Sequence, residues 1–305
     1  MIQGTVIKNF GKFYTVKYDD GVIDCVLRGK IRKDKRLKQF SDPVAVGDRV
    51  DFEISDATGV IDSVHERRNA FTRKDRYSPR EDLIASNCDL IAVVQSFKTP
   101  PFNLRFVDRL LVRGNKEGIP VMLIVNKADL SDESQHQYIK DYYKGVDIIF
   151  RAVSALEETG IEELRQELVD KLTIFVGSSG VGKTSILNAL FPTLDLRISH
   201  VSESSGKGRH TTTNVEMVEL EDHTKIIDTP GLREFGLVDI EPDTLGDFFC
   251  EFGTIDGCNF RPCSHDHEPK CGVKDLVENK IIHPDRYQSY LNILQTLRDH
   301  YNNMY

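Results

Sequence analysis

Hydrophobic and polar residues alternate in short runs over the first 64 positions, with glycine-containing turns such as Asp20-Gly21 between the runs. This alternation is typical of strands with one buried face. Five such strands predict a small barrel of the OB-fold type, an architecture that binds oligonucleotides through one face and its loops. The predicted strands are residues 3–7, 13–18, 22–27, 49–54 and 59–64.

From Cys88 onward, strongly apolar runs alternate with stretches of helical periodicity. This pattern predicts a parallel sheet flanked by helices, in which ligands bind at the carboxyl ends of the strands. The strands are expected at residues 90–95, 121–125, 147–153, 173–176, 215–220 and 225–227, and the helices at 104–117, 133–144, 161–172 and 183–190. The last 70 residues begin with an acidic, mostly helical stretch and end with a helix expected at 284–300.

A phosphate-binding loop follows the strand at 173–176 and opens a helix, which is the context that this motif requires. Its backbone N–H groups and the helix dipole suit phosphate oxygens. We expect Lys183 to neutralise the β- and γ-phosphates and the Thr184 hydroxyl to ligate Mg²⁺. The loop comprises Gly177, Ser178, Ser179, Gly180, Val181, Gly182, Lys183 and Thr184.

A guanine-reading motif, Asn126-Lys127-Ala128-Asp129, follows the strand at 121–125. The Asp129 carboxylate can accept from the ring N–H and the exocyclic amine of guanine, whereas Lys127 would lie along the base and Asn126 would tie the loops together. Ser154 and Ala155, at the end of the next strand, fit the second base-contacting loop. This motif precedes the phosphate loop, whereas ordinary P-loop GTPases have the reverse order. The chain is therefore predicted to be a circularly permuted GTPase.

Two further elements complete the predicted nucleotide switch. Asp228 is expected to hold Mg²⁺ through water, and the Gly231 N–H to meet the γ-phosphate. In the polar loop 206–213 we favour Thr212 as the Mg²⁺-binding hydroxyl, with Thr211 as the alternative. Leu232 stands where many GTPases have a water-orienting glutamine, so His210 is the candidate catalytic group, although a surface histidine without a role is the competing interpretation.

Four potential metal ligands lie within fourteen residues: Cys258, Cys263, His265 and Cys271. Three thiolates and an imidazole satisfy a tetrahedral structural zinc site, with His267 as a rival ligand. Cys250 lies outside this spacing and is expected to be a buried thiol. Domain boundaries are expected at 1–68 for the barrel, 69–235 for the GTPase and 236–305 for a mostly helical zinc-binding domain.

The net charge of −8 conceals a basic N-terminal part, where residues 1–68 carry 13 Lys/Arg against 11 Asp/Glu. Seven cations between Arg28 and Lys38 are opposed within that run only by Asp34. Such density suits contacts with RNA phosphates, the alternative being a solvated loop. No apolar run reaches the roughly 18 residues of a membrane span, so we expect a cytoplasmic monomer with no membrane partner.

The permuted motif order, together with GSSGVGKTS, GRHTTT, DTPGLREFG and CNFRPCSHDHEPKC, resembles the RsgA family of small ribosomal subunit biogenesis GTPases across essentially the full length. The resemblance implies an OB-fold, a permuted GTPase domain and a zinc domain, acting late in maturation of the small ribosomal subunit. It implies hydrolysis of GTP to GDP and phosphate, stimulated by that subunit, with the subunit and its rRNA as partners. It also extends the phosphate loop to Ser185, assigns the four zinc ligands above, and places the histidine implicated in hydrolysis on His210.

Two other interpretations remain at this point: an RNA chaperone whose fold is merely stabilised by nucleotide, and a GTPase that acts on another RNA such as tRNA. A mechanistic hypothesis follows from the permutation, because Gly231 leads into the zinc domain through only a short connection. Movement of the switch would then tilt the zinc domain directly.

Overall fold

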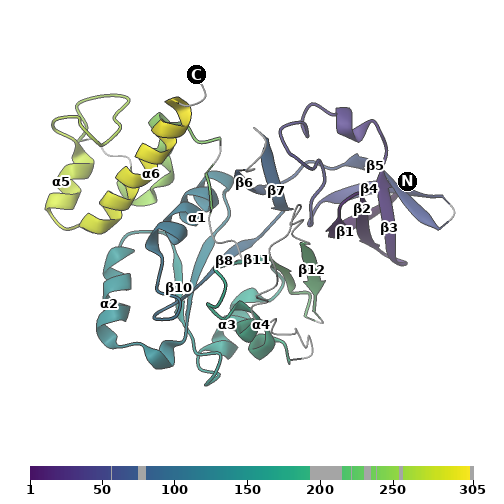
Figure 1. Ribbon diagram of the computed structural model, residues 1–305, viewed down its shortest axis with the longest axis horizontal. Coiled ribbons are helices and arrows are strands. Elements are labelled where there is room, and N and C mark those ends of the chain that lie inside the picture. The colour runs from purple at the N-terminus through teal and green to yellow at the C-terminus, as the bar shows by residue number, and fades with distance from the viewer. Residues whose placement is uncertain are drawn as a thin grey trace, which may run out of the picture.

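The computed structural model describes residues 1–55, 57–74, 80–192, 215–220, 222–229, 235–237, 239–253 and 257–302. A β-barrel lies at one end of the molecule, a layered α/β domain in the middle and a small helical domain at the other end (Figure 1). The three parts follow one another along the chain in broadly this order. The expected multidomain architecture is therefore confirmed.

The barrel is formed by β1 (Ile2–Phe10), β2 (Phe13–Tyr18), β3 (Gly21–Leu27), β4 (Arg49–Ser55) and β5 (Thr58–Val64). Their order is β1-β2-β3-β5-β4, and an antiparallel pairing of β1 with β4 closes the ring. Val6, Val16, Phe52 and Ile61 are fully buried in its centre. All five predicted strands are present, because one buried face gives each of them the alternating pattern.

The central sheet has the order β10-β9-β8-β11-β13-β12, with all neighbours parallel except β12 and β13. Alternate residues of β8 enter different cores: Ile91 and Val93 pack towards α1, and Leu90, Ala92 and Val94 pack towards α3 and α4. The sheet thus carries helices on both faces, as predicted. Its strands are β8 (Leu90–Ser96), β9 (Val121–Asn126), β10 (Ile149–Ala152), β11 (Leu172–Val176), β12 (Glu216–Glu219) and β13 (Lys225–Asp228).

Two of the four helices in this domain are shorter than predicted. The helices are α1 (Leu104–Glu117), α2 (Glu133–Tyr142), α3 (Ile161–Leu168) and α4 (Lys183–Leu190). The prediction carried α2 to residue 144 and α3 to residue 172. Helix α3 ends early because Val169 is extended and Asp170 has a φ of 59°, which turns the chain into β11.

Between the barrel and the central domain lies a hairpin that the sequence analysis did not predict. It consists of β6 (Ala70–Lys74) and β7 (Glu81–Ser86), with Phe71 and Ala85 fully buried. The barrel also meets the central sheet directly, because Lys8 of β1 pairs with Glu216 of β12. This pairing makes a single sheet of eleven strands.

The C-terminal part contains η4 (Pro242–Phe248), η5 (Cys250–Phe252), α5 (Gly272–Glu278) and α6 (Pro284–Asn302). The acidic stretch forms short 3₁₀ helices rather than α-helices, and α6 runs two residues beyond its predicted end at 300. Helix α6 packs against α1, with Tyr290, Ile293, Leu294 and Leu297 buried. Among the described residues, no helix is long and apolar enough to span a membrane.

Candidate nucleotide site and metal centre

Asn126 joins the three loops of the predicted nucleotide site. Its Nδ2 donates to the Val181 carbonyl at 3.0 Å, and its Oδ1 accepts from the Ala155 N–H at 3.1 Å. The side chain is only 3% exposed. A Cβ on Gly182, where φ is +95°, would lie 2.2 Å from Asn126 Nδ2, so glycine is needed both for the turn and for this approach. The base-reading loop is thereby fixed to the phosphate loop.

Asp129 is oriented by the Ser154 side chain, which donates to Asp129 Oδ1 at 2.6 Å and accepts from the Glu157 N–H at 3.2 Å. The sequence predicts that Ser154 belongs to the second base-contacting loop, but it does not predict this contact between the Ser154 hydroxyl and Asp129. A serine at the end of a predicted strand was the only sequence signal for it. Lys127 donates to the carbonyls of Gly180 and Thr99, so its aliphatic stem lies along the edge of the phosphate loop.

The phosphate loop lies at the carboxyl end of β11, and α4 begins at Lys183. Gly177 is packed so closely that a Cβ would lie 2.5 Å from the Val94 carbonyl oxygen. Ser178, Ser179, Gly180 and Val181 complete the turn, and Thr184 and Ser185 lie in the first turn of α4. Lys183 Nζ donates to the Gly177 carbonyl at 2.7 Å, which keeps the ammonium inside the loop.

Asp228 lies on the neighbouring strand, where it pairs in register with Phe175 of β11. Its Oδ1 is buried and has no hydrogen-bond partner among the described residues. Burial raises the Asp228 pKa, although Lys183 acts in the opposite direction. Burial also lowers the pKa of Lys183, with Asp228 opposing that shift. A buried carboxylate oxygen without a partner beside a phosphate loop fits a water-mediated Mg²⁺ contact.

The remaining switch residues predicted from the sequence lie outside the described parts of the chain. These residues are His210, Thr211, Thr212 and Gly231. Thr229 is the last described residue before Gly231. Its hydroxyl donates to the Phe175 carbonyl at 2.7 Å. The strand that delivers the second switch is therefore anchored next to the phosphate loop.

The predicted metal ligands converge in the C-terminal domain: the ligand atoms of Cys258, Cys263, His265 and Cys271 all lie within 4.8 Å of one another. The Cys258–Cys271 and Cys263–Cys271 sulfur pairs are each 3.9 Å apart, and His265 Nδ1 lies 3.7 and 3.3 Å from the sulfurs of Cys258 and Cys271. Zinc–sulfur bonds of about 2.3 Å in a tetrahedron imply sulfur–sulfur edges of about 3.8 Å. The spacing therefore fits a tetrahedral metal ion.

Neighbouring hydrogen bonds hold the ligand-bearing loop on α6. Tyr287 and Tyr290 donate to the carbonyls of His265 and Ser264, each at 2.6 Å. The rival ligand His267 has a side chain that is 76% exposed, and it is not part of the cluster. The prediction that Cys250 is a buried thiol is wrong: the residue is exposed, because its short 3₁₀ helix turns Phe249 and Phe252 inward instead.

A parallel sheet with the phosphate loop after β11, the guanine-reading loop after β9 and Asp228 at the end of β13 defines a P-loop GTPase whose motifs are circularly permuted. A family model described as RsgA GTPase matches residues 64–238, and one described as RsgA N-terminal domain matches residues 3–61. The chain therefore belongs to the RsgA GTPase family.

Relatives of similar length support this assignment. Proteins named small ribosomal subunit biogenesis GTPase RsgA are 40% identical in Flavobacterium johnsoniae and 39% identical in Chlorobaculum tepidum. The alignments cover 98% of this chain in both cases, and 95% and 99% of the relatives. Among solved structures, YjeQ from Thermotoga maritima aligns with a TM-score of 0.77 at 32% identity, covering 97% of this chain and 98% of that one. The circularly permuted GTPase YloQ aligns with a TM-score of 0.72 at 30% identity, covering 98% and 96%.

Proposed function

We propose that this GTPase is a late assembly factor of the small ribosomal subunit, which binds rRNA in its GTP form and leaves after hydrolysis. The observation that carries the proposal is the Asn126 bridge, because it builds one guanine nucleotide site from loops in permuted order. The names of the relatives supply the partner. The same names favour a cytoplasmic protein, and we propose that it acts as a monomer.

The assigned roles at the nucleotide site follow from the contacts around it. Asp129, held by Ser154, accepts from the guanine edge, and Lys127 covers the base. Lys183 leaves the Gly177 carbonyl to pair with the β- and γ-phosphates. Mg²⁺, when bound, neutralises developing phosphate charge, and Thr184, Thr212 and Asp228 are the proposed groups around it. Gly231 meets the γ-phosphate, and His210 positions the attacking water.

The proposed division of labour assigns residues 1–68 to RNA binding, 69–235 to the switch and 236–305 to a zinc-stabilised domain. Zn²⁺ is the proposed metal because three thiolates and one imidazole are its usual structural ligands.

Not every cation of the basic run is available for RNA. Arg28 pairs with Glu53 and Asp62, and Lys30 pairs with Asp62 at 2.6 Å. The RNA-binding charge therefore comes from the later part of the run.

The test is GTP turnover by the full-length protein alone and with small subunits, large subunits or free tRNA. Lys183→Ala removes the ammonium from the phosphate loop, and Lys171→Ala is the matched control, because the Lys171 ammonium lies outside that loop and donates to the Glu167 carbonyl. Strong stimulation by small subunits, lost in Lys183→Ala and kept in Lys171→Ala, supports the proposal.

The competing functions predict different results in the same assay. Equal turnover in every mixture, with subunit binding insensitive to nucleotide, would favour an RNA chaperone and leave His210 without a role. Stimulation by tRNA alone would reassign the partner.

A further inference from the structure

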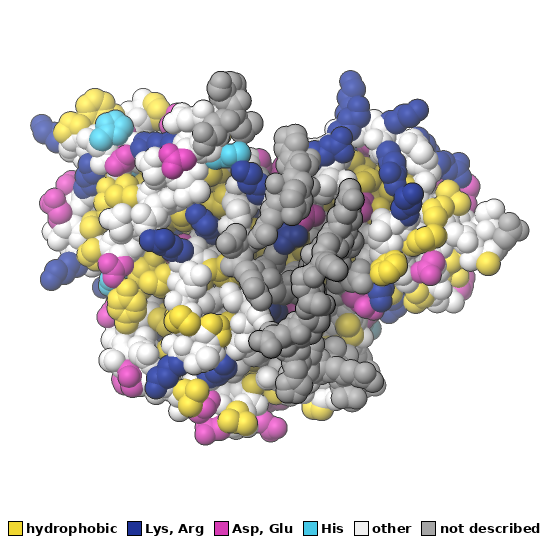
Figure 2. All heavy atoms as spheres, in the orientation of Figure 1, with side chains coloured by type: hydrophobic (Ala, Val, Ile, Leu, Met, Phe, Trp, Pro, Cys, Tyr) yellow, Lys and Arg dark blue, Asp and Glu magenta, His cyan; other side chains and the backbone are white. Residues whose placement is uncertain are grey.

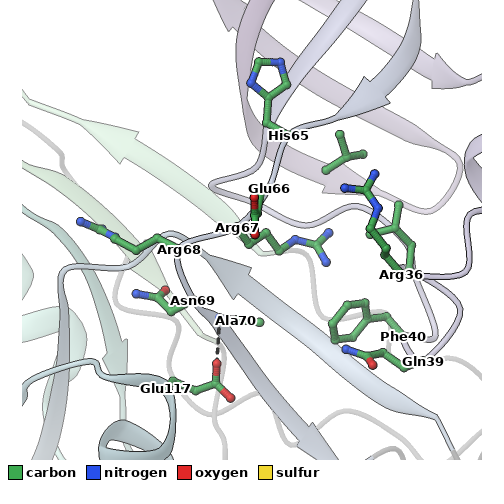
Figure 3. A pocket seen from close by; sticks show the side chains of 12 residues that line it. Arg36, Gln39, Phe40, His65, Glu66, Arg67, Arg68, Asn69, Ala70 and Glu117 are labelled. Atoms are coloured by element: carbon green, nitrogen blue, oxygen red, sulfur yellow. Dashed lines mark hydrogen bonds between the residues drawn. The ribbon is translucent and has the colours of Figure 1, made fainter.

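A pocket of about 290 Å³ lies where the barrel meets the central domain, outside the nucleotide site. Its walls come from three segments: residues 36, 37, 39 and 40 between β3 and β4, residues 64–70 from the end of β5 to the start of β6, and Glu117 at the end of α1. Figure 3 shows Arg67 in the middle of this space, pointing between Arg36 and Phe40. The volume lies just below the usual range of small-molecule sites, about 300–1,000 Å³, so the pocket could take at most one nucleotide.

The floor of the pocket is apolar, because Leu37, Phe40 and Val64 line it and are each at most 8% exposed. The Arg67 guanidinium lies over the Phe40 ring at 5.0 Å. Asp48 fixes its orientation through two bonds of 2.7 Å, and the Pro43 carbonyl accepts a third at 2.7 Å. These bonds use Nε and Nη2 of Arg67, and Nη1 takes part in none of them. The Arg67 side chain is only 9% exposed and one face of its guanidinium lies on Phe40, so the pocket offers a base the guanidinium edge that carries Nη1 rather than an open plane.

The rim of the pocket carries charge suited to a phosphodiester. Arg36 and Arg68 have side chains that are 66% and 60% exposed, and each is tied to one carboxylate, Asp34 and Asp89 respectively. Glu66 also lines the rim, and the two oxygens of Glu117 accept from Arg113 and the Ala70 N–H. Two carboxylates in the lining disfavour a compact, multiply charged anion such as a diphosphate. One singly charged phosphate with an attached base fits better.

The pocket also continues into a basic surface. Lysine and arginine side chains stand out over the barrel in Figure 2. Four exposed cations of residues 32–38 have no ion pair within the described parts of the chain: Arg32, Lys33, Lys35 and Lys38. A single mononucleotide would leave these charges unused, whereas a strand passing over the pocket places successive phosphates along them.

From these observations we infer that the pocket holds one unstacked nucleotide of a single-stranded RNA segment. The base lies at the mouth of the pocket beside Leu37 and Val64, with its polar edge at the Arg67 guanidinium, and the flanking phosphates meet Arg36 and the exposed cations of residues 32–38. This inference rests on the proposed function, because that function supplies the RNA. It adds a discrete base-binding site at the junction of the two domains, where the sequence predicted only a basic loop.

Two variants separate the base contact from the phosphate contact. Gln39→Trp fills the pocket from an exposed lining position. It should weaken binding of a labelled single-stranded RNA of about ten nucleotides roughly tenfold while keeping the salt dependence, because the base contact is lost and no charge changes. Arg36→Gln should weaken binding and lower the slope of log affinity against log salt by about one. Lys140→Gln, on the exposed face of α2, is the charge control and should bind as wild type.

The readout is fluorescence anisotropy on the full-length protein, with the unfolding temperature and basal GTP turnover of each variant checked against wild type. If wild type binds the RNA and both pocket variants bind equally well, the pocket inference is wrong and RNA binding lies elsewhere. If a labelled adenosine monophosphate binds to wild type and loses affinity in Gln39→Trp, while the RNA does not bind, the ligand is a free nucleotide and the inference is again wrong. Neither result touches subunit-stimulated turnover, which tests the proposed function separately.

Discussion

Lys183 and Asp228 both have pKa values shifted towards their neutral forms, and burial is the largest cause for each. Their mutual attraction opposes both shifts but does not outweigh desolvation. A buried ammonium and a buried carboxylate that are incompletely compensated form a site that gains free energy when phosphates and a divalent cation arrive. Binding of the ligand therefore offsets the free-energy cost of burying these two charged groups.

At the same scale, Ser154→Ala should weaken GTP binding, because the hydroxyl that orients Asp129 is lost. A hydrogen bond to a charged group contributes about 1.5–3 kcal/mol, so the dissociation constant should rise about tenfold or more. Ser131→Ala is the matched control, since its hydroxyl donates to the nearby Ala128 carbonyl and does not contact Asp129. Titration with fluorescent GTP and ATP analogues measures affinity and base preference together. Equal losses in the two variants would contradict the orienting role.

The sequence predicts a set of nucleotide-site residues but not how they support one another. Motifs such as Asn126 to Asp129 are recognisable because nucleotide chemistry fixes residue type and spacing. The Ser154–Asp129 contact joins residues 25 positions apart, and serine is common at strand ends in any protein. Its role becomes visible only when β9 and β10 are placed side by side in the sheet.

At the scale of elements, the metal loop depends on its ligands because residues 257–271 contain little regular structure of their own. Cys263→Ser should abolish stoichiometric zinc binding and expose this loop to proteolysis, while GTP affinity stays near that of wild type. Cys250→Ser is the control, since Cys250 is exposed and outside the cluster. Metal analysis by mass spectrometry and limited proteolysis measure the two effects. Full zinc content in Cys263→Ser would remove Cys263 from the ligand set.

A buried charge cluster attaches α6 to the GTPase domain. Arg286 is 1% exposed and pairs with Asp108 of α1 and Glu251 of η5, each at 2.6 Å. Its guanidinium also lies 4.4 Å from the centre of the Phe249 ring. Asp108 further accepts from Tyr142, Tyr143 and Ser289. Three elements of two domains therefore share one desolvated ion network.

Arg286→Met should destabilise the protein strongly, because Asp108 and Glu251 would remain buried without their cation. Breaking a buried pair in this way costs about 3–5 kcal/mol. Arg298→Met on the same helix is the control, since the Arg298–Asp266 pair is about one-third exposed and contributes about 1 kcal/mol at most. Thermal unfolding followed by circular dichroism compares the two. Similar shifts in unfolding temperature would show that the Arg286 network adds little.

The elements that the sequence analysis missed share a physical cause. Hairpin β6–β7 contains charged residues such as Arg73 and Asp82, which pair with each other, and its alternation is interrupted by a register shift after Phe71. Arg286 and Asp108 resemble surface residues in sequence, because charged side chains are rarely fully buried. Periodicity identifies elements with one apolar face, whereas buried charge pairs depend on a partner from a distant segment.

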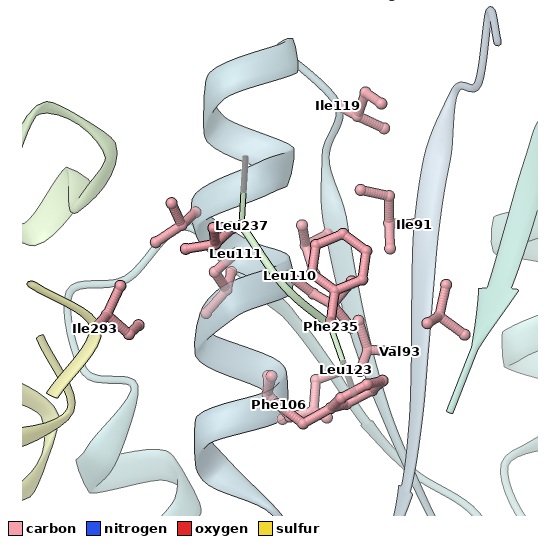
Figure 4. Packing of buried hydrophobic residues seen from close by; sticks show 14 of the residues in the cluster. Ile91, Val93, Phe106, Leu110, Leu111, Ile119, Leu123, Phe235, Leu237 and Ile293 are labelled. Atoms are coloured by element: carbon pink, nitrogen blue, oxygen red, sulfur yellow. The ribbon is translucent and has the colours of Figure 1, made fainter. Parts of the chain in front are cut away.

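At the scale of the whole molecule, the packing argues against direct tilting of the zinc domain by the second switch. The chain leaving that switch enters the core at once: Phe235 and Leu237 are 1% and 7% exposed and lie among Phe106, Leu110 and Leu111 of α1 (Figure 4). Farther along, Arg113 and Lys116 of α1 pair with Asp239. These anchors and the Arg286 network hold the zinc domain and the GTPase domain together as one unit.

The barrel has a different attachment. Its β1 pairs with β12 at Lys8 and Glu216, and the Asn9 N–H donates to the Val215 carbonyl at 3.5 Å. Exposed ion pairs link Lys8 to Glu216 and Lys17 to Glu219. Strand β12 begins three residues after the predicted first switch, 206–213. A nucleotide-dependent shift of that switch therefore reaches β1 before it reaches the zinc domain. The contacts of the barrel at β12 are weak surface pairs, whereas Val46 and Asp48 are held to Ser86 by buried hydrogen bonds, so the barrel would pivot about its contacts with hairpin β6–β7.

We therefore expect exchange of GDP for a non-hydrolysable GTP analogue to move the barrel relative to the GTPase domain and to leave the zinc domain in place. Two pairs of spin labels in a Cys250→Ser background report the two distances. Glu163→Cys with Asp24→Cys spans the GTPase domain and the barrel, and Glu163→Cys with Lys280→Cys spans the GTPase domain and the zinc domain. All three labelled positions are exposed. Pulsed electron spin resonance should show a changed distance distribution for the barrel pair and an unchanged one for the zinc-domain pair. A shift in the zinc-domain pair alone would restore the direct-tilt mechanism, because Phe235 and Arg286 would then have failed to hold the domain against the switch.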